Sequence, residues 1–306
     1  MKTIKLGLSG LSVPAIAVGC MRITKAGKTE AERFIKTALD MGARFFDHAD
    51  IYGKGACEEL FAEAAGMNPT VREKMLLQSK CSIRPGIAFD CSKAYILKSA
   101  EGILKRLKTE YLDVLLLHRP DALMEPEEVA EAFTILHNSG KVRHFGVSNQ
   151  NPYQIQLLKK FVSQPIAVNQ LQLSITNAGM ITQGLRVNLT DDGAVNRDGG
   201  ALDFCRLNDI TIQTWSPLQY GFFEGTFLGN EKFPELNAKL DEIAEKYEVS
   251  STAIALAWLL RHPAKLQPVT GTWNIARFKE CVKATEIVLS REEWYALYLS
   301  AGNTLP

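Results

Sequence analysis

The sequence lacks any apolar run long enough to cross a bilayer. Its longest mainly apolar stretch, Thr252 to Leu260, is closed by Arg261, whereas a membrane-spanning helix needs about 20 consecutive apolar residues. An excess of either charge is also missing, because 35 Lys and Arg face 34 Asp and Glu, for a net charge of +1. No field of the whole chain favours nucleic acid or an anionic membrane. We therefore expect neither as a partner.

Cysteines are few and scattered, and none stands in a CxxC pair or at metal-ligand spacing from a histidine. Six thiols in 306 residues are too sparse for a disulfide scaffold, so a reducing cytoplasm is the simplest compartment. We predict no metal site. The six are Cys20, Cys57, Cys81, Cys91, Cys205 and Cys281.

The N-terminus superficially resembles a lipoprotein signal, because Lys2 and Lys5 precede a fairly apolar stretch that ends at Cys20. Serine, glycine and proline interrupt that stretch, whereas a signal needs an unbroken apolar core. We favour the alternative, a hairpin from Lys2 to Leu11 followed by a buried strand.

Glycine-rich phosphate-binding motifs are missing too. An open, doubly wound sheet normally binds a dinucleotide through GxGxxG after its first strand. The nearest stretch, Gly53 to Glu58, lacks the third glycine, and there is no P-loop. These absences argue against an open dinucleotide-binding sheet.

What the sequence does contain is a regular alternation of strand-like and helix-like segments. The strand-like runs are continuously apolar, which indicates parallel strands buried on both faces. Eight such units fit a single (β/α)₈ TIM barrel, with one domain over residues 1–306. The predicted strands are Ala15–Gly19, Arg44–Asp47, Met75–Ser79, Asp113–Leu117, His144–Val147, Ala167–Gln170, Thr211–Trp215 and Gln267–Thr270.

Helical periodicity fills the segments between these strands. Two polar or glycine-rich stretches, Ser174–Gly200 and Tyr220–Phe233, interrupt the pattern. Loops of that length in a barrel are often lids or substrate walls, and a passive surface insertion is the alternative. The predicted helices are Glu30–Met41, Glu58–Ala65, Tyr95–Leu107, Pro126–Ser139, Pro152–Phe161, Asp241–Tyr247 and Ser251–Arg261, followed by closing helices at Ile275–Ala284 and Arg291–Leu299.

Chemistry in such barrels is found at the carboxyl ends of the strands. Asp47 and Tyr52 follow the second predicted strand, Lys80 follows the third and His118 follows the fourth. Each residue alone has an ordinary structural explanation, such as capping or packing. Together, at three consecutive strand ends, they indicate one shared site.

These residue types can form a proton relay. A phenol with a pKa of about 10 donates a proton poorly at neutral pH. An ammonium about 4 Å away supplies roughly the 3–4 kcal/mol that lowering this pKa by two or three units requires. Lys80 is therefore expected to lower the pKa of Tyr52. Asp47 would hold Lys80 in place, and a neutral His118 would orient a substrate oxygen.

The sequence resembles the aldo-keto reductase family over essentially its whole length. The closest resemblance is to a bacterial subgroup, through the stretches Asp47 to Gly53, Leu117 to Asp121 and Gly140 to Asn149. The resemblance implies that Tyr52 is a general acid and that Asp47, Lys80 and His118 complete a catalytic tetrad. It also implies a nicotinamide cofactor bound across the barrel mouth without a Rossmann domain.

The resemblance assigns further residues to that cofactor. Ser148, Asn149 and Gln170 match positions that bond the carboxamide, and Trp215 stands where an aromatic ring stacks on nicotinamide. The other implied contacts are Asp47, Gly19, Cys20 and Met21 near the ribose, Ser216 and Leu218 near the pyrophosphate, and Gly271, Thr272 and Arg277 near the adenosine.

The adenosine end departs from the common family pattern. Many members have Lys-Ser, followed five residues later by Arg, around a 2′-phosphate. Here Thr272 replaces the serine and Arg277 is kept, but Gly271 replaces the lysine. A planar guanidinium near a helix start still suits a phosphate. We expect NADPH, with NADH possible.

The sequence thus predicts an NADPH-dependent reductase of a small-molecule aldehyde or ketone. One rival is a cofactor-binding regulatory subunit on the same fold with little turnover. Another is a barrel enzyme that uses a metal, which no metal-ligand cluster supports. Arg119 and Asp121 fit either a substrate pocket or a structural ion pair. The substrate, the direction of reaction and the oligomeric state stay open.

Overall fold

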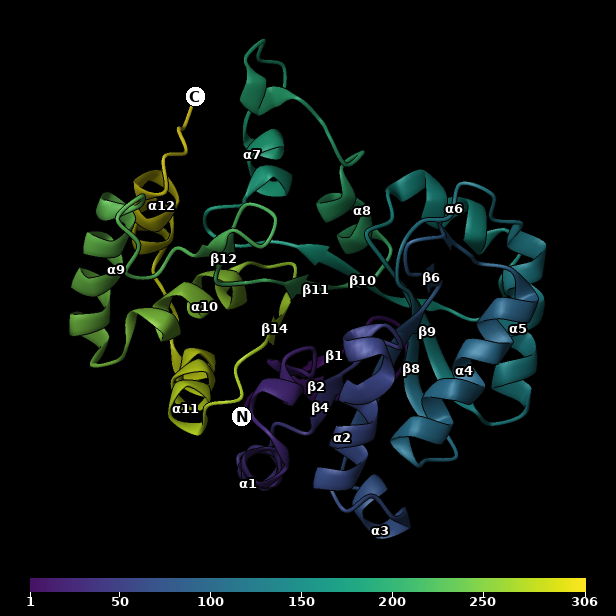
Figure 1. Ribbon diagram of the computed structural model, residues 1–306. Helices are drawn as coiled ribbons and strands as arrows, with labels where there is room; N and C mark the ends of the chain where they lie inside the picture. The colour runs from purple at the N-terminus through teal and green to yellow at the C-terminus, as the bar shows by residue number, and fades with distance from the viewer.

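Eight parallel strands close into a barrel, which confirms the predicted fold. The computed structural model describes residues 1–306. Every neighbouring pair of barrel strands is parallel, and β14 pairs with β3 to close the ring. Helices surround the strands (Figure 1). In chain order the strands are β3 (Ala17–Gly19), β4 (Phe45–Asp47), β5 (Leu76–Cys81), β8 (Leu112–Leu117), β9 (Val142–Ser148), β10 (Ile166–Gln172), β11 (Thr211–Trp215) and β14 (Gln267–Thr270).

The helices mostly follow the predicted order along the chain. None of them combines the length and the apolar composition that crossing a membrane requires. The α-helices are α1 (Lys28–Asp40), α2 (Ala56–Ala64), α3 (Pro69–Arg72), α4 (Lys93–Leu107), α5 (Pro126–Asn138), α6 (Pro152–Lys159), α7 (Gly179–Leu185), α8 (Ala201–Leu207), α9 (Pro234–Tyr247), α10 (Ser251–Arg261), α11 (Ile275–Lys283) and α12 (Arg291–Ser300). Short 3₁₀ turns are η1 (Ile23–Lys25), η2 (Tyr52–Gly55), η3 (Asp192–Ala194) and η4 (Ala284–Glu286).

Helix α9 begins earlier than the sequence predicts. It starts at Pro234, because proline is favoured in the first turn, where its missing N–H costs nothing. The stretch Ser174–Gly200 is not a plain loop either, since it contains α7 and η3. Helix α7 has glycine at its first position and only one buried side chain, that of Ile181. Periodicity over so short a segment gives little signal.

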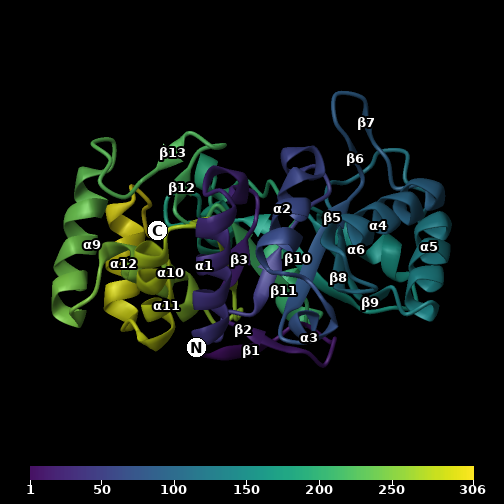
Figure 2. The same cartoon turned by 60° about the horizontal axis from the view of Figure 1, so that its bottom comes forward.

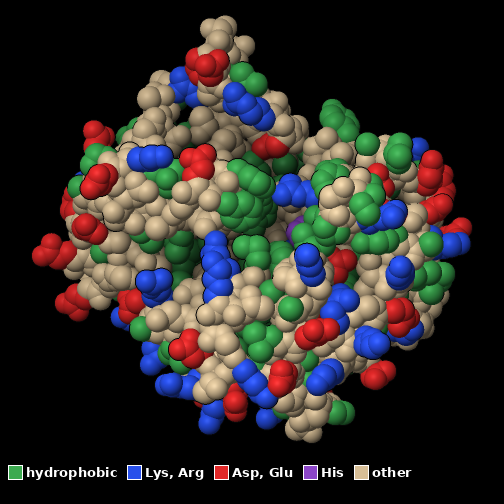
Figure 3. Space-filling view, in the orientation of Figure 1, with side chains coloured by type: hydrophobic (Ala, Val, Ile, Leu, Met, Phe, Trp, Pro, Cys, Tyr) green, Lys and Arg blue, Asp and Glu red, His purple; other side chains and the backbone are tan.

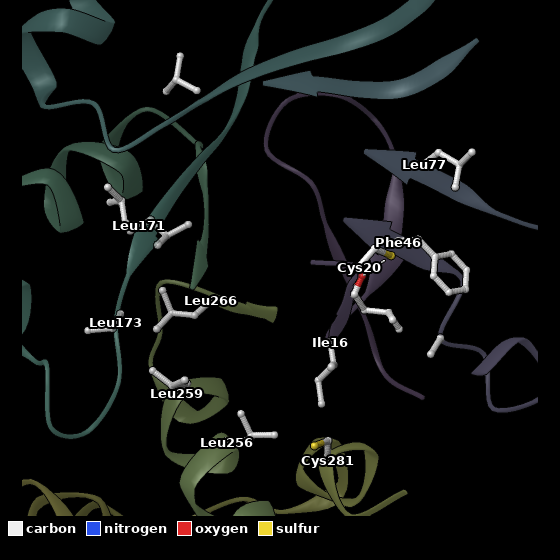
Figure 4. Packing of buried hydrophobic residues seen from close by; sticks show 14 of the residues in the cluster. Ile16, Cys20, Phe46, Leu77, Leu171, Leu173, Leu256, Leu259, Leu266 and Cys281 are labelled. Carbon is white, nitrogen blue, oxygen red and sulfur yellow. Dashed lines mark hydrogen bonds between the residues drawn. The ribbon is translucent and has the colours of Figure 1, made fainter. Parts of the chain in front are cut away.

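Two apolar layers form the core. A cluster of 67 buried residues fills the space between the strands and the surrounding helices. Figure 4 shows part of it, where Leu256 and Leu259 of α10 lie beside Leu266, the residue just before β14. A separate cluster of 10 buried residues, including Phe45 and Val114, fills the interior of the barrel.

An N-terminal hairpin closes the bottom of the barrel. Strands β1 (Thr3–Lys5) and β2 (Ser12–Pro14) pair antiparallel, and Leu6 and Val13 join the inner cluster. Gly7 has a φ of +49° and sits so close to the barrel that a Cβ there would lie 2.4 Å from the carbonyl oxygen of Ala167. Only glycine fits this approach. Two other hairpins, β6 (Ile83–Arg84) with β7 (Ala88–Phe89) and β12 (Gln219–Tyr220) with β13 (Gly225–Thr226), lie at the opposite end (Figure 2).

A buried ion pair fastens α3 to the bottom of the barrel. Arg72 donates to Asp113 Oδ2 at 2.6 Å, and the backbone N–H of Leu77 donates to the same oxygen at 2.8 Å. Arg143 reaches the other carboxylate oxygen at 3.2 Å. The two arginines also lie over the ring of Tyr111, each with its guanidinium carbon 3.8 Å from the ring centroid.

The two arginines differ in burial, and this difference predicts different stabilities for two matched variants. The side chain of Arg72 is 4% exposed and that of Arg143 is 50% exposed. Arg72→Ala leaves Asp113 buried without its main partner and should lower the free energy of unfolding by about 3–5 kcal/mol. Arg143→Ala should lower it by less than about 1 kcal/mol. Urea denaturation measures both, and equal losses would contradict the assignment.

Candidate active site

The four side chains that the sequence singles out meet at one mouth of the barrel. Asp47 ends β4, Lys80 lies near the end of β5 and His118 directly follows β8. Tyr52 opens η2, where its backbone N–H donates to the carbonyl of Ala49 at 3.0 Å. A cavity of about 1140 Å³ at this mouth is lined by Asp47, Tyr52 and His118. Figure 3 shows the hollow, with one histidine visible inside it among hydrophobic side chains.

The ammonium of Lys80 is the centre of this arrangement. Its side chain is fully buried and lies within hydrogen-bond reach of three oxygens. These are Asp47 Oδ2 at 2.8 Å, the carbonyl of His48 at 2.7 Å and the phenol oxygen of Tyr52 at 3.2 Å. Burial by itself would lower the pKa of Lys80, but Asp47 and Tyr52 outweigh burial, so the pKa is raised. Lys80 therefore stays charged.

Asp47 is held from the other side by amides inside the barrel. Gln78 donates to Asp47 Oδ1 at 2.6 Å, and Gln170 donates to the same oxygen at 3.1 Å. Both glutamines also bond the side chain of Gln213. With Lys80 on Oδ2, every accepting oxygen of the buried carboxylate has a donor, as a buried charge requires.

Tyr52 has a higher pKa than the sequence argument expects. Burial raises the pKa of its phenol most, and the charge of Asp47 adds to this effect. The charge of Lys80 lowers the pKa, as predicted, but does not outweigh burial. The predicted net lowering is therefore wrong. The sequence argument counted the ammonium and left out the loss of water around the phenol.

His118 is neutral at physiological pH. Burial lowers the pKa of His118 well below its usual value, and the positive charges of Lys80 and Arg119 act in the same direction. Its ring lies edge-on to Tyr52, with centroids 6.0 Å apart and an angle of 84° between the planes. A neutral imidazole has one donor and one acceptor nitrogen. It can therefore donate to an oxygen in the cavity without carrying charge.

Two further buried acidic side chains, those of Glu58 and Asp50, lie close enough to Lys80 to feel its charge. Glu58 of α2 accepts from Ser79 Oγ and from Arg106 Nε, both at 2.7 Å. Asp50 has one buried carboxyl oxygen without a partner. Burial raises the pKa of Asp50 to about 7, nearby Glu58 adds to the rise, and Arg106 opposes it. Nothing in the sequence points to these two residues, because Glu58 looks like an ordinary helix residue.

Four of the predicted nicotinamide contacts form one hydrogen-bonded chain at the mouth. Trp215 Nε1 donates to Asn149 Oδ1 at 3.1 Å, and Asn149 Nδ2 donates to Ser148 Oγ at 2.8 Å. Ser148 in turn donates to the backbone oxygen of Gln170 at 2.9 Å. The side-chain amide nitrogen of Gln170 donates to Asp47 and to Gln213, so its Oε1 is left to accept a hydrogen bond. The ring of Trp215 is stacked against Phe223, with centroids 5.7 Å apart.

The structure brings almost all predicted contacts of the cofactor to the same cavity. Cys20 is the exception, because its side chain is fully buried in the layer between strands and helices, where Sγ lies 3.7 Å from the carbonyl of Val18. The predicted residues that line the cavity are Gly19, Met21, Asp47, Ser148, Asn149, Gln170, Trp215, Ser216, Leu218, Gly271, Thr272 and Arg277.

Arg119 and Asp121, whose roles the sequence analysis left open, have different roles in the structure. Arg119 lines the cavity and has no carboxylate partner. Asp121 accepts from the backbone N–H groups of Cys91 and Leu123, both at 2.8 Å, so it shapes a loop. The two do not form an ion pair. Nowhere do three or more His, Cys, Asp or Glu side chains gather as a possible metal site.

Sequence reasoning missed three further cations at the cavity. Arg22, Lys25 and Arg33 line it alongside Arg277. They come from the loop after β3 and from α1, far from Arg277 in the sequence. Only the closed barrel brings β3 beside β14 and so places these segments together.

Comparisons with known proteins agree on one family. The sequence profile described as "Aldo/keto reductase family" matches residues 15–298. A "6-dehydroglucose reductase" of Novosphingobium aromaticivorans is 34% identical over 99% of this chain and 96% of its own length. "Oxidoreductase YdhF" of Escherichia coli is 35% identical over 88% of this chain and 86% of its own length.

Solved structures give the same result. A thermostable aldo-keto reductase in complex with the inhibitor epalrestat superimposes with a TM-score of 0.78, at 29% identity over 98% of this chain and 100% of its own. An aldo-keto reductase from Klebsiella pneumoniae in complex with NADPH gives a TM-score of 0.75, at 26% identity over 97% of this chain and 93% of its own.

The buried carboxyl of Asp50 predicts a pH-dependent stability. Its pKa is about 7 in the folded protein and about 4 in an unfolded chain. Between these values the folded state binds a proton that the unfolded state has lost, so stability falls as pH rises from about 4 to 7. Asp50→Asn removes this loss. Its stability relative to the wild type should therefore grow by about 2–3 kcal/mol between pH 5 and pH 8.

Urea denaturation at the two pH values measures this effect. Asp192→Asn, at an exposed position in η3, is the control and should change stability by less than about 0.5 kcal/mol at both. Parallel pH profiles for Asp50→Asn and the wild type would show that Asp50 is not protonated in the folded state.

Proposed function

Since this chain belongs to the aldo/keto reductase family, we propose that Tyr52 donates the proton when it reduces an aldehyde or ketone with NADPH. The enzyme is an NAD(P)H-dependent oxidoreductase, and NADPH-bound relatives support NADPH as its cofactor. The observation that carries the role of Tyr52 is the contact of its hydroxyl with a buried, charged lysine. Lys80 Nζ lies 3.2 Å from that oxygen and 2.8 Å from Asp47.

The cavity suits the cofactor in three respects. It extends from Tyr52 to Arg277, as an extended dinucleotide requires. Gln170 presents an unpaired Oε1, which can accept from the amide N–H of the carboxamide. Arg22, Lys25 and Arg33 line it together with Arg277, so the phosphates of a nucleotide would find opposite charge there. The chain's own residues therefore fit NADPH.

The proposed contacts follow the order of groups along the cofactor. Ser148, Asn149 and Gln170 would hold the carboxamide, and Trp215 would lie against the nicotinamide ring. Ser216 and Leu218 would border the pyrophosphate. The remaining contacts are proposed for Gly19 and Met21 near the ribose and for Gly271, Thr272 and Arg277 around the adenosine.

The chain's own residues perform the proton half of the reaction. The chemistry that the cofactor supplies when bound is the transfer of a hydride from C4 of the nicotinamide to the carbonyl carbon. Neutral His118 donates a hydrogen bond to the carbonyl oxygen and orients it. Tyr52 gives its proton to the same oxygen, and the adjacent ammonium of Lys80 stabilises the phenolate that remains. Asp47 keeps that ammonium in place.

The high pKa of Tyr52 keeps its phenol protonated across the physiological range. The proton that carbonyl reduction needs is therefore present, and the charge of Lys80 offsets part of the cost of releasing it.

The substrate is proposed only as a small carbonyl compound. The outer cavity combines aromatic surface from Trp215 and Phe223 with the unpaired guanidinium of Arg119, so it can take a molecule with both apolar and polar parts. Two relatives carry the name 6-dehydroglucose reductase. Sugar aldehydes therefore belong in a substrate screen beside simple aliphatic and aromatic aldehydes.

A cofactor-binding regulatory subunit is the alternative that the fold allows. Measuring NADPH oxidation with this aldehyde panel separates the two functions, because a regulatory subunit would bind NADPH with little turnover. We also propose a cytoplasmic location, because all six cysteines are unpaired and buried, as a reducing compartment permits.

Replacing the hydroxyl of Tyr52 tests the central proposal. Tyr52→Phe keeps the ring and removes only the proton donor. It should lower kcat by at least about 100-fold, the usual contribution of a general acid, and leave the dissociation constant for NADPH within about twofold. Wild-type turnover in this variant would refute the assignment. Loss of NADPH binding would instead indicate a structural role.

Arg277 predicts the preference between the two cofactors. Its guanidinium can bind a phosphate that NADPH has and NADH lacks. The wild type should have a lower KM for NADPH, and Arg277→Ala should raise that KM by about 10-fold or more without changing the KM for NADH. A preference for NADH that Arg277→Ala leaves unaltered would contradict this role.

A further inference from the structure

The space beside Gly271 is occupied by an arginine from another part of the chain. Gly271 follows β14 and has no side chain of its own to offer a ligand. A Cβ built on it would have a single neighbour within 4 Å outside its own chain segment, Arg22 Nη1 at 3.2 Å. Arg22 lies between β3 and η1, so it comes from the opposite end of the sequence. Its guanidinium thus stands next to the position where many family members have a lysine.

Arg22 has no partner within the protein. Its side chain forms no ion pair and no hydrogen bond, and it is only partly buried. It lines the same cavity as Lys25, Arg33 and Arg277, and the carboxylate of Glu30 also lines this cavity. A guanidinium that lines a cavity and forms no ion pair with a carboxylate is suited to an anionic ligand.

Aromatic packing holds together the two segments that carry Arg33 and Arg277. Phe34 of α1 lies 5.0 Å from Phe278 of α11 and 4.7 Å from Trp273, measured between ring centroids. Figure 1 shows α1 and α11 near one another below the mouth. Arg33 and Arg277 directly precede the two phenylalanines. The N-terminus of α11 faces the same cavity through Asn274 and Ile275, and its positive end adds to the field.

We propose that Arg22 is the residue that recognises the 2′-phosphate of NADPH in this chain, in place of the lysine that Gly271 removes. Arg22 approaches the phosphate from the β3 side and Arg277 from the α11 side. The glycine contributes to this arrangement, because a Cβ at position 271 would lie 3.2 Å from Arg22 Nη1 and the guanidinium would have to shift slightly. This inference rests on the proposed binding of NADPH and does not depend on the role of Tyr52.

Equilibrium binding tests this role without using turnover. Arg22→Gln keeps much of the length and removes the charge. Titrations with NADPH and with NADH, followed by quenching of tryptophan fluorescence, give the two dissociation constants. The loss of one charge-assisted contact should weaken NADPH binding by about 10- to 100-fold and leave NADH binding within about twofold. Arg291→Gln, at an exposed position on α12, is the matched control and should change neither constant.

A second variant distinguishes recognition from a general effect on folding. In Arg22→Gln/Gly271→Lys, the new lysine can enter the space that the guanidinium of Arg22 occupies in the wild type and should recover at least part of the lost affinity for NADPH. Adenosine 2′,5′-bisphosphate, which lacks nicotinamide, should lose affinity for Arg22→Gln in the same proportion as NADPH, while adenosine 5′-monophosphate should not.

Three other results would contradict either the role of Arg22 or the cofactor assignment. Equal weakening of NADPH and NADH would place Arg22 on a group that both cofactors share, such as the pyrophosphate, and would overturn the proposal. No weakening of either would overturn it as well. Failure of the wild type to bind NADPH at all would contradict the cofactor assignment itself, whatever Arg22 does.

Discussion

The buried ammonium of Lys80 is the constraint around which the mouth of this barrel is built. An uncompensated charge at such a depth costs several kcal/mol, so three oxygens have to be supplied by β4 and by the turn that follows it. Asp47 then becomes a second buried charge, which needs donors of its own. Gln78 and Gln170 supply them.

These donors belong to a row of hydrogen-bonded glutamine side chains inside the barrel. Gln213 links Gln78 to Gln267, and Gln267 donates to the carbonyl of Pro14 at 2.6 Å. Barrel interiors are more often filled by layers of branched apolar side chains. Here hydrogen-bonded glutamines share the interior with the apolar cluster and connect the site to the N-terminal hairpin. The chemistry at the mouth is therefore supported by the same contacts that hold the barrel together.

The sequence predicted the barrel and the meeting of four side chains well, because both follow from local patterns. Continuous apolar runs fix the strands, and parallel strands carry their last residues to one edge. Burial and long-range pairing leave no such pattern. The net pKa of Tyr52, the position of Cys20 behind the strand and the neighbourhood of Arg22 and Gly271 all depend on how distant segments pack. Helix α7 was missed because so short a segment gives weak periodicity, and the prediction began α9 seven residues late, at Asp241 instead of Pro234.

The N-terminal hairpin bears on how the polypeptide folds during synthesis. Gly7 donates to the hydroxyl of Thr211 at 2.8 Å, and Pro14 and Gln267 are separated by 253 positions. At a translation rate of about 5–20 residues per second, roughly 13–50 s pass between the emergence of these two partners from the ribosome. During that interval the first strands have no closing neighbour, and their apolar edges are exposed. The ring can therefore close only after nearly the whole chain has been made.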